Sequence, residues 1–241
     1  MKRPQPIGIL GAMASEVALL KESMQVIQGT EAAGTMFLEG QLAGVPIVLA
    51  QCGIGKVRAA MCAQAMIDHY NVKWLINTGV AGGLHPQLRI GDIVLATYAV
   101  EHDFDLTTWG YARGHHPADD AARDKVTAYA ASKRLNIRLK EAAMAAEFPG
   151  KLVEGIIASG DVFVADRALK RRLLAEFGAA AVEMEGGAIA HVAAANGVPF
   201  AIVRAVSDLA DGTAVESFDS FEAEAAAHSA AMLIQMAREL D

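Results

Sequence analysis

The sequence predicts one three-layer α/β/α domain with a central mixed β-sheet, spanning residues 1–241. Short apolar runs of β-strand type alternate with segments of helical spacing along the whole chain. Hydrophobic residues make up 53% of the chain and charged residues 20%, so a large core can be buried. No linker, internal repeat or low-complexity block divides the sequence. These three observations favour a single α/β domain.

The first half of the chain alternates strands and helices from its start. A turn at Ala43-Gly44 joins two β-type runs into a hairpin, and Gly79 closes a buried apolar strand. Gly91-Asp92 precedes the next strand, and the small residues of segment 56–69 have helical spacing. The predicted elements are strand 7–10, helix 14–24, strands 35–41 and 45–51, helix 56–69, and strands 74–78 and 93–99.

The second half continues the alternation after a long irregular segment. Asp119 is predicted to cap a helix, and Asn196-Gly197-Val198-Pro199 ends another. The predicted elements are helix 120–135, strand 152–158, helix 166–177, strand 180–183, helix 186–196, strand 200–206 and helix 218–240. Residues 101–118 lack clear periodicity and are rich in His, Asp and aromatic residues. A loop this long in a compact domain is usually functional or lies at an interface.

Composition argues against several classes of protein. The net charge is −7 without a basic stripe, which disfavours binding to nucleic acid. Cys52 and Cys62 lack CxxC spacing, so we expect buried, reduced thiols in a cytoplasmic protein. The apolar run 7–10 after the basic start is short and interrupted by glycine, unlike a signal peptide. No apolar run reaches the ~18 residues of a membrane span.

Three acidic residues stand where predicted strands end. Glu16 follows the first strand, Glu185 precedes a small-residue helix, and Asp208 ends the strand that begins at Phe200. Each alone has an ordinary explanation, because the helix dipole stabilises a glutamate in the first turn and an aspartate can cap a loop. Together they would converge on the sheet edge where open α/β sheets bind ligands. Charged groups there are costly without a partner, so they predict a site.

Several other motifs are weaker. Gly53-Ile54-Gly55-Lys56 lacks the Ser or Thr of a phosphate-binding P-loop, and Gly-x-Ser-x-Gly is absent. The glycines of segment 79–83 indicate either a tight turn or close approach of the backbone to a ligand. His102-Asp103-Phe104-Asp105 and His115-His116 are of metal-binding types, but no His-x-x-x-His frames them. We therefore expect no metal and no cofactor.

The chain closely resembles the 5'-methylthioadenosine/S-adenosylhomocysteine nucleosidases, within the purine nucleoside phosphorylase-like superfamily, nearly from end to end. The resemblance implies a nucleoside phosphorylase-like fold and a homodimer that binds small adenine thionucleosides. The motifs that carry it, in order, are Gly11-Ala12-Met13 with Glu16, Gly53-Ile54-Gly55-Lys56, Asn77-Thr78-Gly79-Val80-Ala81-Gly82-Gly83, Gly91-Asp92-Ile93-Val94, Ser159-Gly160-Asp161 with Phe163, Glu183-Met184-Glu185 and Arg204-Ala205-Val206-Ser207-Asp208.

The resemblance implies hydrolysis of the N-glycosidic bond, with adenine as the leaving group. Asp208 would protonate N7 of the purine, for which it must hold a proton near neutral pH. Glu185 would bind the ribose hydroxyls and favour the oxocarbenium-like charge. Glu16 would be the general base for water, with Arg204 nearby. The logic parallels inverting glycosidases, in which one carboxyl serves the leaving group and another the water.

The resemblance also implies the pocket. Phe163 would stack on adenine, backbone groups of Val164 would read its edge, Met184 would pack on the ribose, and Ser207 would orient Asp208. The 5'-alkylthio group would lie against Ile54 and Phe218. Leu106, Trp109 and Pro117 would come from the neighbouring subunit across a dimer interface. The remaining predicted substrate contacts are Val80, Ala81 and Gly82.

Three positions, one in segment 79–83 and two in the long loop, depart from the family pattern. Val80 stands where many relatives have serine, which removes a hydroxyl from the ribose or water side of the site. Leu106 and Trp109 stand where relatives often have Val and Phe. The larger indole would narrow the thioalkyl channel and alter the preference between methylthio and homocysteinyl substrates.

Three alternative functions differ from this one in the substrate, in the nucleophile or in the absence of catalysis. A hydrolase of another adenine nucleoside, such as 6-amino-6-deoxyfutalosine, would use the same acids. A phosphate-dependent purine nucleoside phosphorylase would need cationic and hydroxyl donors where this chain has Glu16 and Val80. A non-catalytic nucleoside-binding module would keep Phe163 and Met184 but would need no acids.

Overall fold

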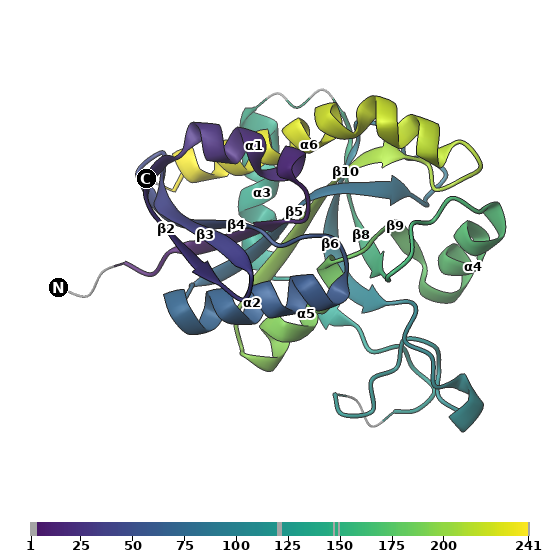
Figure 1. Ribbon diagram of the computed structural model, residues 1–241. Coiled ribbons are helices and arrows are strands. Elements are labelled where there is room, and N and C mark those ends of the chain that lie inside the picture. Colours follow the sequence, from purple (N-terminus) through teal and green to yellow (C-terminus); the bar gives the residue numbers. More distant parts are fainter. Residues whose placement is uncertain (1–3, 120–121, 147, 149, 241) are drawn as a thin grey trace.

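The chain folds into a central sheet with helices on both faces, as Figure 1 shows for the computed structural model. The structure describes residues 4–119, 122–146, 148 and 150–240. Helices α1 (Ala14–Ser23), α3 (Lys133–Ala145) and α6 (Ala214–Arg238) cover one face, and α2 (Lys56–Tyr70) and α5 (Gly186–Ala195) cover the other. Helix α4 (Arg167–Phe177) packs beside strands β8 (Leu152–Ser159) and β9 (Ala179–Glu183). The predicted three-layer α/β/α class is confirmed.

The sheet is mixed and partly closed on itself. Strands β1, β4, β5 and β10 are mutually parallel along their shared pairings, whereas β9 is antiparallel to β5 and β6 is antiparallel to β10. The order is β10-β6-β8-β9-β5-β1-β4-β3-β2, and β10 also pairs with β5, which closes five strands into a ring. Their bounds are β1 (Ile7–Gly11), β2 (Gln25–Ala32), β3 (Thr35–Leu42), β4 (Val45–Gln51), β5 (Trp74–Gly83), β6 (Ile93–Glu101), β7 (Tyr129–Ala130), β8 (Leu152–Ser159), β9 (Ala179–Glu183) and β10 (Phe200–Asp208).

The core lies on both faces of the sheet. Neighbouring residues of β5 point to opposite layers, so Leu75 packs in the cluster under α2 and α5, and Ile76 packs in the cluster under α1, α3 and α6. Both side chains are fully buried. Strands covered on both faces read as continuous apolar runs, which is why the sequence revealed them.

The predicted helix 120–135 is wrong over residues 122–132. Residues 122–128 are irregular, and Tyr129–Ala130 pairs with β6 as β7. The helix begins only at Lys133, where the Ser132 hydroxyl accepts a hydrogen bond from the Leu135 amide. Pairing with a distant strand overrides the local helical preference here. Residues 120 and 121 lie outside the described part of the chain.

Three further corrections to the predicted elements are needed, and the other elements agree within four residues at each end. Segment 79–83 is not a turn, because β5 continues through it to Gly83. Strand β2 was not predicted, since nearly all of its residues are exposed and no apolar face marks it. Residues 102–119 and 122–128 are irregular apart from the 3-10 turn Thr107–Trp109, while Glu101 ends β6.

Two smaller expectations can be compared with the structure. Cys52 and Cys62 are free and buried, as predicted, and burial raises the pKa of the Cys62 thiol to about 12. None of the described helices combines the length and the hydropathy required to cross a membrane.

Candidate active site

The three predicted acids gather at one end of the sheet. Glu16 lies in the first turn of α1 directly after β1, Asp208 ends β10, and Glu185 is the N-cap residue of α5 after β9. Because β1, β5 and β10 are parallel neighbours, their carboxyl ends meet at this edge. All three acids line one cavity of about 100 Å³. The convergence predicted from the strand ends is therefore present.

Most of the predicted substrate contacts surround the same cavity. Phe163 is 43% exposed at the cavity and packs edge-to-face on Phe218, with ring centroids 5.6 Å apart. Val164 lines an adjoining cleft of about 30 Å³ that shares Phe163 and Asp208 with the main cavity. The other predicted residues in the cavity wall are Ile54, Val80, Ala81, Gly82, Met184 and Ser207.

Arg204 lies beneath the cavity and joins two of the acids. It is fully buried, with Nη1 3.4 Å from Glu16 Oε1 and Nη2 3.3 Å from Glu185 Oε2. Nη2 also donates to Glu183 and, over 2.6 Å, to Asn77 Oδ1. Arg204 is not among the residues that line the cavity, and it contacts the carboxylates from beneath.

Glu16 is held by backbone amides. Its Oε2 accepts hydrogen bonds from Ala12 (2.6 Å) and Met13 (3.0 Å), and its Oε1 accepts from Val80 (2.9 Å). Burial raises the pKa of Glu16, while Arg204 and these amides oppose the rise. The carboxylate is therefore positioned by the turn between β1 and α1 and by β5 together.

Gly79 explains why this part of β5 is rich in glycine. A Cβ atom at this position would lie 2.1 Å from Glu16 Oε1 and 2.4 Å from Arg204 Nη1, and the φ angle is +148°. Position 79 requires glycine because the side chains of Glu16 and Arg204 lie against its Cα atom. Glycine in segment 79–83 thus makes room for protein groups rather than for a turn.

Glu185 and Asp208 are both buried acids. Glu185 Oε1 accepts a hydrogen bond from the Gly55 amide at 2.8 Å. Burial raises the pKa of Glu185 to about 7; the positive charge of Arg204 opposes this rise, and the negative charge of Glu183 adds to it. Asp208 accepts from Ser207 Oγ (2.9 Å) and from the Ala210 amide (2.8 Å). Burial raises the pKa of Asp208, which favours a carboxyl that keeps its proton.

Sequence reasoning assigned no role to Glu183 or Asn77. Glu183 Oε2 accepts from the amides of Glu185 (3.1 Å) and Gly186 (2.7 Å), and it also accepts from Arg204. Asn77 fixes the guanidinium and donates to the Leu10 carbonyl at 3.0 Å. A second acid two residues before Glu185, at the end of the same buried strand, was the available signal for Glu183.

Leu106, Trp109 and Pro117 are not brought to this cavity within the chain. They lie on the segment that projects from the body of the molecule (Figure 1), and Trp109 is 72% exposed. Leu106 is half-buried and Pro117 is exposed.

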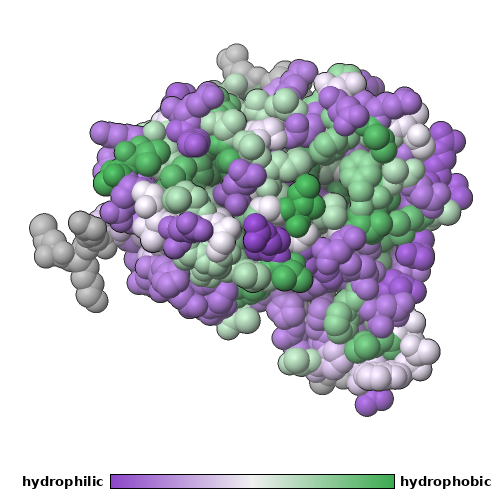
Figure 2. Space-filling view, in the orientation of Figure 1, coloured by the Kyte–Doolittle hydropathy of each residue, from purple (hydrophilic) through white to green (hydrophobic). Residues whose placement is uncertain are grey.

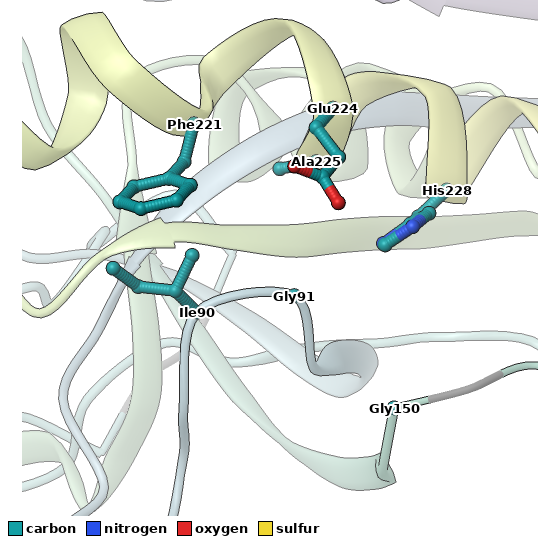
Figure 3. A pocket seen from close by; sticks show the side chains of 7 residues that line it. All are labelled: Ile90, Gly91, Gly150, Phe221, Glu224, Ala225 and His228. Carbon is teal, nitrogen blue, oxygen red and sulfur yellow. The ribbon is translucent and has the colours of Figure 1, made fainter.

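A larger hollow of about 330 Å³ lies elsewhere and holds a different set of groups. Figure 3 shows it between α6 and the loop before β6. Among the described residues that line it, Glu224 and His228 are titratable, and Glu224 is exposed. Among the described hollows, the acid-lined cavity is the one where Glu16, Glu185 and Asp208 converge from the ends of different strands.

Comparison with known proteins agrees with this geometry. Residues 6–238 match the phosphorylase superfamily. The chain is 42% identical to a 5'-methylthioadenosine/S-adenosylhomocysteine nucleosidase of Geobacillus kaustophilus, over 95% of this chain and 94% of that protein. The solved nucleosidase of the same name from Neisseria meningitidis, in complex with methylthio-immucillin-A, is 38% identical with a TM-score of 0.90 over 98% of this chain and 99% of that one. A futalosine hydrolase structure from Helicobacter pylori is 37% identical, with a TM-score of 0.90 over 98% of each chain.

Proposed function

Since the chain belongs to the phosphorylase superfamily and, within it, to the 5'-methylthioadenosine/S-adenosylhomocysteine nucleosidases, which are N-glycosyl hydrolases, we propose that it hydrolyses the N-glycosidic bond of these two adenine thionucleosides. Adenine and the thioribose compound would be the products. The observation that carries the proposal is that Glu16, Glu185 and Asp208 line one cavity.

Asp208 is the proposed general acid. Adenine leaves poorly as an anion, so its N7 must receive a proton as the bond to the sugar breaks. Burial raises the pKa of Asp208, and Ser207 Oγ lies 2.9 Å from its Oδ2. Ser207 would thereby fix the orientation in which the acid meets the purine.

Glu16 is the proposed general base for the attacking water. A base must be ionised, and the three backbone amides and Arg204 favour the ionised form against burial. Oε1 accepts from the Val80 amide at 2.9 Å and lies 3.4 Å from Arg204 Nη1, and it would accept the proton of the water. Glu185 would accept hydrogen bonds from the ribose hydroxyls and stabilise the positive charge that develops on the sugar.

The apolar part of the cavity suits the rest of the substrate. Phe163 offers an exposed ring face for adenine, next to the backbone of Val164. Met184 lines the cavity together with Glu16 and Glu185, which would flank the ribose. Ile54 and Phe218 would bound the 5'-alkylthio group. A mostly apolar lining with few fixed polar groups is typical of small-molecule sites.

A second copy of the chain would complete the site. Trp109 is 72% exposed, and Ile54 (56%), Val57 (69%) and Met61 (47%) are exposed around the start of α2. Figure 2 shows hydrophobic side chains both on the projecting loop and on the body of the molecule. We infer a homodimer in which Leu106, Trp109 and Pro117 reach the partner's cavity, because exposed apolar groups of this kind mark interaction surfaces.

Two related reactions are to be distinguished. The likeness to a futalosine hydrolase supports 6-amino-6-deoxyfutalosine as a second candidate substrate, since the same three acids would serve it. A phosphorylase is disfavoured, because buried Glu16 would repel phosphate and Val80 supplies no hydroxyl.

The test is release of adenine from each candidate nucleoside by the full chain in phosphate-free buffer. Asp208→Asn should lower kcat by about 10²–10⁴-fold while substrate binding persists. Asp211→Asn, an aspartate of the following loop outside the cavity, is the matched control and should keep its activity. Undiminished turnover in Asp208→Asn would remove this residue from the mechanism, and activity that requires added phosphate would favour a phosphorylase.

A further inference from the structure

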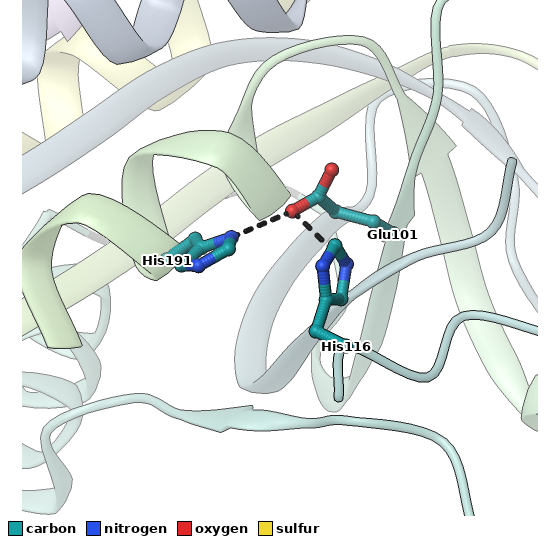
Figure 4. Close-up of side chains that lie close together, drawn as sticks. All are labelled: Glu101, His116 and His191. Carbon is teal, nitrogen blue, oxygen red and sulfur yellow. Dashed lines mark hydrogen bonds and ion pairs between the residues drawn. The ribbon is translucent and has the colours of Figure 1, made fainter. Parts of the chain in front are cut away.

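A second cluster of titratable residues lies outside the acid-lined cavity. Glu101 at the end of β6, His116 in the projecting loop and His191 in α5 converge, and one potential ligand atom from each lies within 4.8 Å of the others. Figure 4 shows both imidazoles directed at the same oxygen of Glu101. None of the three lines the cavity of Glu16, Glu185 and Asp208. The proposed nucleosidase reaction leaves the cluster without a role.

The distances fit the coordination sphere of a small metal ion. His191 Nδ1 is 3.1 Å and His116 Nε2 is 3.4 Å from Glu101 Oε1. With metal–ligand bonds of about 2.0–2.2 Å, ligand atoms of a tetrahedral site are about 3.3 Å apart. The two imidazole nitrogens would need to approach by at most about 1.5 Å to complete that geometry.

His116 supplies a polar atom with no other use. It is only 8% exposed, and its Nε2 makes no hydrogen bond among the described residues, despite its proximity to Glu101. A buried nitrogen without a partner is costly, and a neutral imidazole nitrogen is a common metal ligand. The ring stacks on Phe104 with centroids 4.0 Å apart, which holds it toward the cluster.

The surrounding groups are those expected around a metal site. The other ring nitrogen of His191, Nε2, is 3.0 Å from Asp119 Oδ2, and Asp119 accepts from Tyr129 at 2.7 Å. A carboxylate on the far nitrogen orients a metal-binding histidine. Lys56 Nζ holds the other oxygen of Glu101 at 2.9 Å, which leaves Oε1 as a single ligand.

The charge and the access of the cluster also suit a cation. With neutral histidines, the carboxylates of Glu101, Asp103 and Asp119 and the ammonium of Lys56 leave two net negative charges. The His191 side chain is 34% exposed and borders a hollow of about 330 Å³ that offers an entry path. One divalent cation would balance the charge.

We propose that Glu101, His116 and His191 bind one divalent transition-metal ion, with Zn²⁺ as the best match to a His₂Glu set. The ion would tie the projecting loop to α5 and β6. We expected no metal from the sequence because no His-x-x-x-His frame exists, whereas these three residues come from separate segments that meet only in the tertiary structure.

The test titrates Co²⁺ and then Zn²⁺ into the chelator-treated full chain. Visible absorption reports coordinated Co²⁺, and competition with a chromogenic chelator gives the Zn²⁺ affinity. We expect one ion per chain. His116→Gln and His191→Gln should each weaken binding at least about tenfold, and Asp119→Asn should weaken it about 10–100-fold. His69→Gln, at an exposed histidine, is the control and should bind as the unmodified chain does.

Three results would overturn the proposal. These are no stoichiometric binding of either ion, binding that survives both histidine substitutions, and equal loss in His69→Gln. In the first case the cluster is a hydrogen-bonded one, in which a proton on His191 serves Glu101 and Asp119. His191 is partly exposed, so His191→Gln keeps the test decisive if His116→Gln fails to fold. The readout is metal binding and is independent of nucleosidase activity.

Discussion

Gly79→Ala is the substitution that most directly tests how the site is held. The added Cβ would lie 2.1 Å from Glu16 Oε1, whereas ordinary contact begins at 3.4 Å. Glu16 must therefore retreat by more than an ångström. That movement breaks the 2.9 Å hydrogen bond from Val80 and separates Glu16 from Arg204.

The expected cost has two parts. Loss of a charge-assisted hydrogen bond to a buried carboxylate costs about 1.5–3 kcal/mol. A non-glycine residue at a φ of +148° adds about 1–3 kcal/mol of backbone strain. We expect the free energy of unfolding to fall by about 3–5 kcal/mol, which a domain stable by about 5–15 kcal/mol can survive. A shift of about 1 Å in the proposed base should lower kcat/KM about 10²-fold.

The assay is urea denaturation together with adenine release from 5'-methylthioadenosine. Two controls separate the causes. A Cβ at Gly212 or at Gly178 meets nothing within 4 Å, but only Gly178 has a positive φ, of +60°. Gly178→Ala should show the backbone strain alone and Gly212→Ala neither effect, both with unchanged kcat/KM. If Gly79→Ala is as active and as stable as Gly178→Ala, the reasoning about Glu16 is refuted.

Three further predictions concern charge, specificity and assembly. Burial raises the pKa of Glu185 from 4.5 to about 7, so the folded state holds a proton that the unfolded state has released between these pH values. The free energy of unfolding should therefore fall by about 3 kcal/mol as pH rises through this window, and an equally steep fall in Glu185→Gln would contradict this. Trp109→Phe should change the ratio of kcat/KM for 5'-methylthioadenosine and S-adenosylhomocysteine, because a smaller ring widens the channel, and an unchanged ratio would refute that role. Replacement of residues 104–113 by a short linker should give a monomer with low activity in sedimentation and adenine-release assays, and a fully active monomer would exclude the proposed completion of the site by the partner.

Much of the candidate site was predictable because its residues follow strands that are buried on both faces. Glu16, Glu185 and Asp208 each come at or just after the end of such a strand, where a local apolar run is visible without any knowledge of pairing. Strand β2, almost wholly exposed, gave no comparable signal. Helix 120–135 was misplaced because Tyr129 joins a distant strand instead.

The sequence by itself determined the alternation of strands and helices and the edge at which three acids would meet. Only the tertiary structure decided what holds those acids. Arg204 lies under Glu16 and Glu185, Gly79 leaves room for the Glu16–Arg204 contact, and Glu183 anchors the start of α5. The same holds for Glu101, His116 and His191, which are up to 90 residues apart in sequence. Periodicity and burial are local properties that a sequence displays, whereas hydrogen bonds and ion pairs between distant segments exist only after the sheet has closed.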